Sequence, residues 1–320
     1  MSRFAIYLSI FAFVNFIYLY YNQAINNRRG VKMSKFIISG FSDEIDPATD
    51  VQFEHLNKLG IKYFEPRNID GTNIADLTEG QAHALKEKMD RYGIKVSSIG
   101  SPIGKILITD DFAPHLEKLE HVLKIAKILD AKYIRIFSFY IPEGEMPEKY
   151  TDEVMRRMQA MTAAAEKTDI ILLHENEKGI YGDVAKRCLE IFKNVTSKHL
   201  RGVFDPANFI QCGQKVYPDA YEMLRPYIDY IHVKDALSDG KVVPAGKGNG
   251  SWNSLIKAFA ESGYEGFLSL EPHLGEFEGL GALENGDIMK GLEKSSAGKF
   301  TLAYNSLKEI LEEEKVSWTR

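Results

Sequence analysis

The stretch Ile170-Ile171-Leu172-Leu173-His174-Glu175-Asn176-Glu177 decides the fold. Four consecutive branched apolar residues are typical of a strand that is buried on both faces, as in a parallel sheet covered by helices. The strand leads directly into a polar cluster that contains two carboxylates and an imidazole. Because unpaired charged groups are costly to bury, we expect this cluster to lie at a functional site.

Three later strands end in the same way. The three strands, each given with the polar residue that follows it, are Arg201–Phe204 with Asp205, Tyr227–Ile231 with His232, and Gly266–Leu270 with Glu271. Together with Glu175, they place two glutamates, one aspartate and one histidine at corresponding ends of four successive strands. Carboxylates and imidazole are common ligands of divalent cations, so the pattern indicates a metal site.

The alternation of strand and helix signals extends over residues 35–320. Besides the four strands already named, apolar runs predict strands at Phe36–Phe41, Lys62–Phe64, Lys95–Ile99 and Tyr133–Phe137. Eight strands, each followed by a helix, within about 280 residues predict a (β/α)8 TIM barrel. A doubly wound sheet would carry a glycine-rich phosphate-binding sequence after its first strand, and the turn at residues 40–44 carries none.

Local signals mark where the first two helices begin and end. Asp46 followed by Pro47 predicts a helix start, and Gly60 predicts the end of that helix. Thr78 and Gln81 have the spacing of a capping box, which predicts the start of the next helix. The two helices would connect the first three strands.

The composition is that of a globular enzyme with a sizeable core. Of the 320 residues, 44% are hydrophobic and 27% are charged. The formal net charge of −5 argues against a nucleic-acid-binding protein, because such domains are usually basic. The two cysteines, Cys188 and Cys212, make neither a disulfide framework nor a zinc motif and suit a reducing cytoplasm.

Residues 1–32 form an apolar extension, which we separate from the catalytic domain at 33–320. The segment Phe4–Tyr21 is almost entirely apolar and roughly long enough to cross a bilayer core of ~30 Å. Basic residues follow at positions 28, 29 and 32, and would keep the domain on the cytoplasmic side if the segment were a membrane anchor. The alternative is that Met33 is the true start. A membrane partner is expected only in the first case, and a cytoplasmic domain in both.

The barrel fold should bring the four polar strand ends together. In TIM barrels, the functional groups come from the C-terminal ends of the strands. The side chains concerned are Glu175, Asp205, His232 and Glu271. Three crowded carboxylates repel one another, and a divalent cation removes this conflict. The mixed oxygen and nitrogen donors suit Mn²⁺, Mg²⁺ or Co²⁺ better than they suit a thiolate-rich structural zinc site.

From about Phe36 to Leu311, the chain resembles the xylose isomerase-like TIM barrels known as sugar phosphate isomerases/epimerases. The matching motifs are His174-Glu175-Asn176-Glu177, Phe204-Asp205-Pro206-Ala207-Asn208, His232-Val233-Lys234-Asp235, Gly246-Lys247-Gly248-Asn249-Gly250-Ser251-Trp252 and Glu271-Pro272-His273. The resemblance implies a single divalent metal ion, for which Mn²⁺ is the first expectation. Its implied ligands are Glu175, Asp205, His232 and Glu271. The resemblance also implies that Glu175 and Glu271 are catalytic and exchange protons with the substrate.

The resemblance further implies an isomerase or epimerase of a small sugar or polyol ketone, with or without a phosphate group. A metal ion polarises the carbonyl group of such a substrate and stabilises an enediolate. One glutamate removes a carbon-bound proton, and the other returns a proton to the opposite face or to the adjacent carbon. A lyase that expels a β-hydroxyl group, like the inosose dehydratases of this fold, is the alternative.

Two further classes of protein use the same barrel. DNA-repair endonucleases of this fold bind several zinc ions with more histidines, whereas the first, third and fourth predicted strands here end without one. A barrel that only binds a sugar would not need the complete ligand set. We therefore expect a small-molecule partner and no nucleic acid, and the sequence leaves the formation of a homo-oligomer open.

Six residues are candidates for substrate contact, namely Glu65, Arg67, Lys105, His174, Asn208 and Lys234. A structural role is the alternative for each of the six, and Glu65 and Arg67 could simply pair with other charges on the barrel rim. Asn208 stands where similar ketose 3-epimerases carry a histidine. Asparagine can hydrogen-bond to a hydroxyl group but does not titrate near neutrality, so this departure argues against the 3-epimerase subtype.

Two loops after the later strands carry further hypotheses. The run Gly246–Gly250 suits either a phosphate-binding turn or a tight turn that leads into a helix near Trp252, and we favour the tight turn. The segment Gly275–Ser296 is rich in glycine and glutamate and follows the eighth strand. It suits either a lid over the active-site face or a solvated loop.

Overall fold

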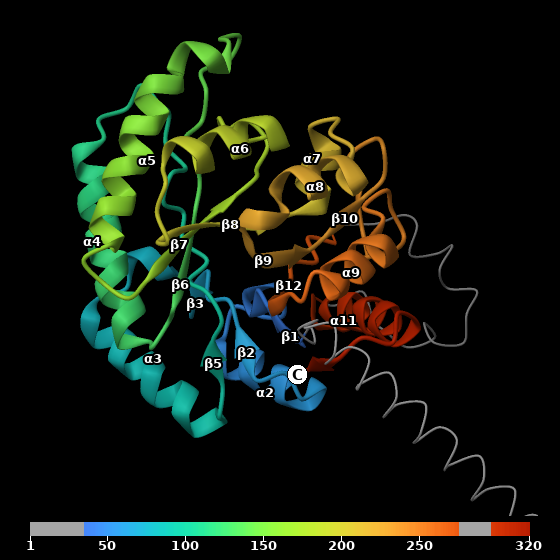
Figure 1. Cartoon of the computed structure of the whole chain (residues 1–320). Coiled ribbons are helices and arrows are strands. Elements are labelled where there is room, and N and C mark those ends of the chain that lie inside the picture. The colour runs from blue at the N-terminus through green and yellow to red at the C-terminus, as the bar shows by residue number, and fades with distance from the viewer. Residues whose placement is uncertain (1–34, 275–295) are drawn as a thin grey trace, which may run out of the picture.

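The computed structural model describes residues 35–274 and 296–320 (Figure 1). The apolar segment Phe4–Tyr21 and nearly all of the loop Gly275–Ser296 lie outside the described residues. Within the two described ranges, no helix combines the length and the hydrophobicity needed to cross a membrane.

Seven strands form one parallel sheet. In spatial order they are β13 (Trp318–Thr319), β1 (Lys35–Gly40), β12 (Glu265–Leu270), β9 (Ile228–Val233), β8 (Leu200–Phe204), β7 (Ile171–Glu175) and β6 (Tyr133–Ile136). Each neighbouring pair is parallel. All of these strands except β13 coincide with strands predicted from the sequence.

Two short strands complete the barrel. β2 (Tyr63–Phe64) pairs in parallel with β5 (Lys95–Val96). The end of β2 is joined to β1 by a hydrogen bond from Glu65 N to Gly40 O (2.9 Å). Beyond β5, Ile99 forms a parallel bridge to β6. The described residues thus contain all eight predicted barrel strands, and the predicted (β/α)8 fold is confirmed.

Helices alternate with the strands and surround them (Figure 1). In chain order they are α2 (Thr49–Leu59), α3 (Glu79–Tyr92), α4 (Ala113–Ile128), α5 (Thr151–Ala165), α6 (Ala185–Asn194), α7 (Pro206–Gln211), α8 (Tyr221–Leu224), α9 (Trp252–Glu261) and α11 (Ser296–Glu313). Shorter helical turns are η1 (Ser42–Glu44), η2 (Ile74–Asp76), η3 (Pro147–Tyr150), η4 (Val216–Ala220) and η5 (Arg225–Tyr227). The two small antiparallel pairs outside the barrel are β3 (Asn68–Ile69) with β4 (Thr72–Asn73), and β10 (Asp235–Ala236) with β11 (Val242–Val243).

One of the two predicted helix starts is correct. At α3, Gln81 N donates to Thr78 Oγ1, and the Gln81 side chain accepts from Thr78 N, so the predicted capping box is present. α2 begins later than predicted, because its N-cap is Ala48. Asp46 Oδ1 accepts a hydrogen bond from Ala48 N (2.8 Å) and closes a turn before the helix, so Pro47 precedes α2 rather than opening it.

The alternation of side chains along β7 separates two apolar regions. Leu173 packs inside the barrel against Tyr230 of β9. Leu172 belongs to the larger core between the strands and the helices. Successive side chains of a strand point to opposite faces. Glu175 therefore shares the inner face with Leu173, and His174 shares the outer face with Leu172.

The glycine-rich loop at residues 246–250 binds an acidic side chain of the same chain. The Asp235 carboxylate accepts hydrogen bonds from Gly246 N and Gly248 N, each at 3.0 Å, and from Gly250 N at 2.8 Å. Convergent backbone amides of this kind are the usual donors to a bound phosphate. Because Asp235 already satisfies them, the structure supports the tight turn over the phosphate site.

A side chain at Gly248 should disrupt this turn. A Cβ atom there would lie 2.4 Å from Ala236 O and 2.5 Å from Asp235 Oδ1. We expect Gly248→Ala to lower the free energy of unfolding by about 1–3 kcal/mol, the usual cost of overpacking, as measured by urea denaturation. Gly80→Ala is the control, since a Cβ atom at this helical position meets only Thr78 Oγ1, at 4.0 Å. Equal stability of Gly248→Ala and wild type would contradict the assigned turn.

Candidate metal centre

The four predicted metal ligands meet at the C-terminal end of the barrel. Glu175, Asp205, His232 and Glu271 each offer one ligand atom, and these atoms lie within 4.8 Å of one another. All four residues are buried, with exposed fractions of 3% or less. The structure therefore brings together, from four strands, a group that could hold one metal ion.

The register of the parallel strands produces this convergence. Glu175 is the last residue of β7 and is level with Val203 of β8, two positions before Asp205. His232 of β9 is level with Ser269 of β12, two positions before Glu271. Side chains two positions apart lie on the same face of a strand. The four ligands can therefore point into the barrel from the same rim.

Two asparagines hold the ends of β7 and β8 together. Asn176 Nδ2 donates to Asp205 O (2.9 Å), and Asp205 N donates to Asn176 Oδ1 (3.0 Å). Asn208 N donates to Asp205 Oδ1 (2.9 Å), and Asn208 Nδ2 donates to Asn176 O (2.9 Å) and more weakly to Glu175 Oε1 (3.4 Å). Asn208, a predicted substrate contact, thus lies directly among the ligands and also fixes the orientation of Asp205.

Cationic groups contact the carboxylates of the site. Lys234 Nζ lies 2.8 Å from Asp205 Oδ2 and 3.1 Å from Glu271 Oε2. His232 Nδ1 lies 2.8 Å from Glu175 Oε1 and 3.4 Å from Glu271 Oε2. Each of the three carboxylates therefore has at least one positive partner or imidazole within the protein.

The pKa values follow from burial and from these contacts. Burial raises the pKa of Asp205 to about 7, although the Lys234 ammonium acts in the opposite direction. Burial alone would lower the pKa of His232, but the Glu175 carboxylate raises it well above its ordinary value. For Glu175, burial acts to raise the pKa, and His232 and Arg135 outweigh it and lower the pKa to about 2. Burial therefore outweighs the neighbouring cation at Asp205, whereas the neighbouring cations outweigh burial at Glu175.

The donor set fits a divalent cation. Three carboxylates and one imidazole supply oxygen and nitrogen ligands of the kind that Mn²⁺, Mg²⁺ and Co²⁺ accept. Glu175 Oε2 and Asp205 Oδ2 are buried and accept no hydrogen bond. Lys234 Nζ is close to Asp205 Oδ2, but it is not aligned for a hydrogen bond to that oxygen. Buried acceptors without hydrogen bonds are costly. Coordination to a cation held by Glu175, Asp205, His232 and Glu271 would satisfy both oxygens.

Comparison with known proteins agrees with this architecture. The model of the xylose isomerase-like TIM barrel family matches residues 53–293. The chain belongs to this family.

Solved structures of similar shape include a D-tagatose 3-epimerase-like protein, with 19% sequence identity and a TM-score of 0.66 over 89% of this chain and 100% of that one. The IolI protein with a bound zinc atom is 15% identical, with a TM-score of 0.68 over 88% of this chain and 99% of that one. The "probable 3-DHS dehydratase AsbF" from Bacillus anthracis is 17% identical, with a TM-score of 0.63 over 85% and 99%. At such identities the likeness establishes the fold, and the function must be argued from the site.

Arg135 also contacts the candidate metal site, although it is not among the residues predicted from the sequence. Its Nη1 lies 3.4 Å from Glu175 Oε2, and its Nη2 donates to Gly100 O (3.2 Å). The guanidinium carbon lies 5.0 Å from the ring centroid of Phe41 and 4.9 Å from that of Phe137. The available signal was a charged residue in the middle of the predicted strand at 133–137, where burial requires a partner.

Arg67 and Lys105 lie at the edge of the site and are partly exposed. Arg67 Nε donates to Asp43 Oδ2 (2.9 Å), and its Nη1 lies 3.8 Å from Glu271 Oε1. Lys105 Nζ donates to Glu177 Oε2 (3.1 Å). Arg67 therefore forms the rim ion pair that was the alternative to substrate contact, and it also contacts a predicted ligand.

His174 does not lie where its predicted substrate contact requires. It is on the outer face of β7, and its ring packs edge-on against Phe192 of α6, with centroids 6.0 Å apart. A Cβ atom at Gly182 would lie only 2.4 Å from the His174 ring. The sequence prediction is corrected because the residue next to Glu175 on a strand must point away from it.

Glu65 lies deeper in the barrel than a substrate contact or a rim ion pair would require. It is fully buried, and its carboxylate accepts hydrogen bonds from Tyr230 Oη (2.9 Å) and Ser269 Oγ (2.7 Å) inside the barrel. β2 ends one residue earlier, at Phe64, so Glu65 is still within the barrel wall. The structure therefore does not support direct substrate contact by Glu65.

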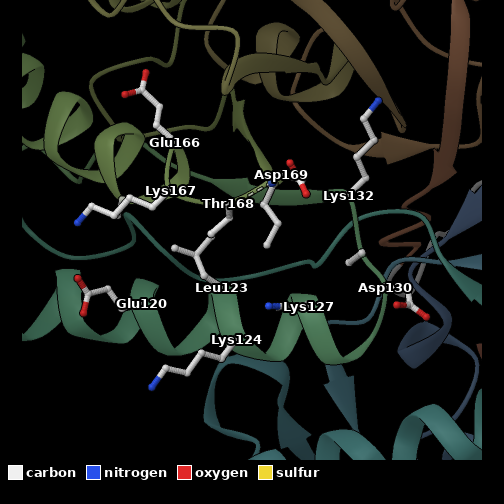
Figure 2. Close-up of a pocket in the computed structure, with 13 residues that line it drawn as sticks. Glu120, Leu123, Lys124, Lys127, Asp130, Lys132, Glu166, Lys167, Thr168 and Asp169 are labelled. Carbon is white, nitrogen blue, oxygen red and sulfur yellow. Dashed lines mark hydrogen bonds between the residues drawn. The ribbon is translucent and has the colours of Figure 1, made fainter.

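A cavity of about 910 Å³ lies at the other end of the barrel (Figure 2). Side chains of α4 line one side of it, and residues 166–169 line the other. Lys132 directly precedes β6 and Ile170 directly precedes β7, so the cavity adjoins the N-terminal ends of these strands. None of the four predicted ligands lines it. Active sites of TIM barrels form at the opposite end.

We expect chelator-treated protein to bind one Mn²⁺ ion per chain, as measured by isothermal titration calorimetry. His232→Ala should weaken this binding by more than the ~10–100-fold that is typical for residues behind the ligands, because it removes a ligand. His83→Ala, at an exposed histidine on α3, is the control and should bind like wild type. Equal affinities for His232→Ala and wild type would rule out this metal centre.

Proposed function

We propose that the protein is a divalent-metal-dependent isomerase or epimerase of a small sugar or polyol ketone. The observation that carries this proposal is the buried group of three carboxylates and one imidazole at the C-terminal end of the barrel. The D-tagatose 3-epimerase-like protein of similar fold supports the substrate class. The acidic net charge favours a small-molecule partner over nucleic acid.

The proposed metal ion is Mn²⁺, with Mg²⁺ and Co²⁺ as alternatives, since the same mixed oxygen and nitrogen donors accept all three. When bound, the cation would polarise the carbonyl group of the substrate and stabilise the negative charge that develops after proton removal. The residues proposed to hold it are Glu175, Asp205, His232 and Glu271. The similar IolI structure contains a bound zinc atom, which supports the proposal of a divalent cation.

Glu175 and Glu271 are proposed to exchange protons with the substrate. They come from the ends of β7 and β12, which flank β8 and β9 in the sheet, and therefore approach the site from two sides. One carboxylate would remove a proton from carbon. The other would return a proton to the opposite face, which gives an epimer, or to the adjacent carbon, which gives an isomer.

Other polar groups are proposed to orient the substrate. The Lys234 ammonium, between Asp205 and Glu271, could stabilise negative charge on a substrate oxygen. Asn208 Nδ2 lies close enough to Glu175 to donate to a hydroxyl group beside it. Arg67 and Lys105, at the edge of the site, could reach the more distant hydroxyl or phosphate groups.

A lyase that eliminates water from a ketone is the second candidate. It is favoured by the similarity of the fold to the structure described as a probable 3-DHS dehydratase. The same proton removal next to a carbonyl group would serve both reactions, and elimination also requires a β-hydroxyl group that leaves. Only elimination creates an enone, whose ultraviolet absorbance distinguishes the two.

We expect the Mn²⁺-loaded protein to incorporate solvent deuterium at one carbon of its substrate in a panel of ketoses and inososes. Glu175→Gln and Glu271→Gln should each reduce turnover by ~10²–10⁴-fold, because each removes a proton-transferring group. Mass spectrometry and nuclear magnetic resonance measure the deuterium.

Glu87→Gln, at an exposed carboxylate of α3, is the matched control and should retain wild-type turnover. Turnover of Glu175→Gln at the wild-type rate would remove Glu175 from the proposed mechanism. Sugar binding without turnover or deuterium exchange would indicate a binding protein instead of an enzyme.

A further inference from the structure

Glu65 is a buried carboxylate for which proton transfer and metal coordination assign no role. Its backbone is fixed by a hydrogen bond from Glu65 N to Gly40 O (2.9 Å), which joins the end of β2 to β1. Its side chain is fully buried. A carboxylate in such a place is costly unless several partners satisfy it.

The partners of Glu65 come from two strands that also carry proposed metal ligands. Tyr230 Oη donates to Glu65 Oε2 at 2.9 Å, and Ser269 Oγ donates to the same oxygen at 2.7 Å. Tyr230 precedes His232 by two positions on β9, and Ser269 of β12 precedes Glu271 by two positions. The Glu65 carboxylate thus lies deeper in the barrel than the proposed ligands and contacts the same two strands, β9 and β12.

The third partner of Glu65 is the imidazole of His232. Its Nε2 lies 3.4 Å from Glu65 Oε1 and 3.3 Å from Glu65 Oε2. The other ring nitrogen, Nδ1, faces the ligand group, 2.8 Å from Glu175 Oε1. His232 therefore spans from the buried carboxylate on one side to the ligand group on the other.

Serine hydroxyl groups extend this network across the barrel and hold it in place. Ser97 Oγ lies 2.8 Å from Tyr230 Oη and donates to Phe64 O (3.0 Å). Ser39 Oγ lies 2.6 Å from Ser97 Oγ. All of these groups are buried, so the position of Glu65 is fixed by several strands at once.

This arrangement indicates which nitrogen of His232 would bind a metal ion, because Nδ1 faces the ligand group and Nε2 faces Glu65. A carboxylate lies beside each ring nitrogen of His232, and a nitrogen that binds a metal ion must be free of its proton. Glu175 is itself a proposed ligand and Glu65 is not, so a bound cation would take the place of the Nδ1 proton and leave the Nε2 proton with Glu65. With the proton on Nε2, the lone pair of Nδ1 points at the ligand group. Carboxylates behind metal-binding histidines act in this way, because they fix the ring orientation and make the imidazole a stronger ligand.

We infer that Glu65 is a positioning residue, which holds His232 in the orientation that would bind the metal ion through Nδ1. The inference rests on the proposed metal site and goes beyond it, since it assigns a role to a residue that touches neither metal nor substrate. It replaces the substrate contact expected from the sequence.

The test is the affinity of the full-length, chelator-treated protein for Mn²⁺, measured by isothermal titration calorimetry. Glu65→Gln keeps the shape of the side chain and removes its charge. We expect Mn²⁺ binding to weaken by ~10–100-fold, as for other groups behind metal ligands. Thermal unfolding without metal should show that the variant remains folded.

Ser269→Ala is the matched control within the same buried network. It removes one hydrogen bond to Glu65 Oε2 but leaves the contact between Glu65 and His232 in place. If Glu65 acts through His232, this variant should bind Mn²⁺ much more tightly than Glu65→Gln. Equal losses of affinity in the two variants would show that the network only supports the fold, and would overturn the inference.

A second variant and a second signal keep the test independent of folding. Glu65→Asp keeps the charge but withdraws the carboxylate from His232 Nε2 by one methylene group, so weaker Mn²⁺ binding is again expected. The visible absorption spectrum of the Co²⁺-loaded protein, which reports the ligand field, should differ between wild type and Glu65→Gln.

Unchanged affinity and spectrum in both Glu65 variants would overturn the inference and leave the proposed function standing. Failure of the wild-type protein to bind a divalent metal would remove the proposed metal site itself.

Discussion

Three carboxylates and one imidazole share a small buried space, and their mutual repulsion is the constraint on which the rest of the site depends. Ionised carboxylates at this separation are unfavourable unless positive charge lies between or beside them. The chain supplies part of that charge through Lys234 and Arg135, both nearly fully buried. A divalent cation would supply the remainder. The same arrangement would then serve proton transfer, because a carbonyl oxygen near the cation acidifies the neighbouring carbon.

The fold could be predicted because its signals are local and repeated. Apolar runs predict the barrel strands, and one rule, that functional groups stand at the C-terminal ends of barrel strands, predicts that the four proposed ligands lie close together, as they do. The capping box at Thr78 also holds, since it depends on residues three positions apart. The start of α2 was less predictable. An aspartate followed by proline can open a helix, but here the Asp46 side chain accepts a hydrogen bond from Ala48 N in a turn that precedes the helix.

The roles of other residues could not be predicted, because they depend on which face of its strand a side chain occupies and on how far inside the barrel it lies. His174 is adjacent to Glu175 in sequence, yet the pleat of β7 turns it towards the helices. Glu65 looks like a rim residue in sequence, but the short strand β2 leaves it inside the barrel. Asp235 could not be recognised as the anion that the glycine-rich loop binds, since that contact joins residues 11 to 15 positions apart.

The most direct measurement is a crystal structure of the Mn²⁺-loaded protein, in which anomalous scattering locates the ion. The proposed site requires one ion within about 2.0–2.6 Å of oxygen atoms of Glu175, Asp205 and Glu271, the range of hard divalent cations. It also requires His232 to face the ion through Nδ1 while Nε2 remains against Glu65. An ion bound elsewhere, or four ligand side chains directed away from one another, would contradict it.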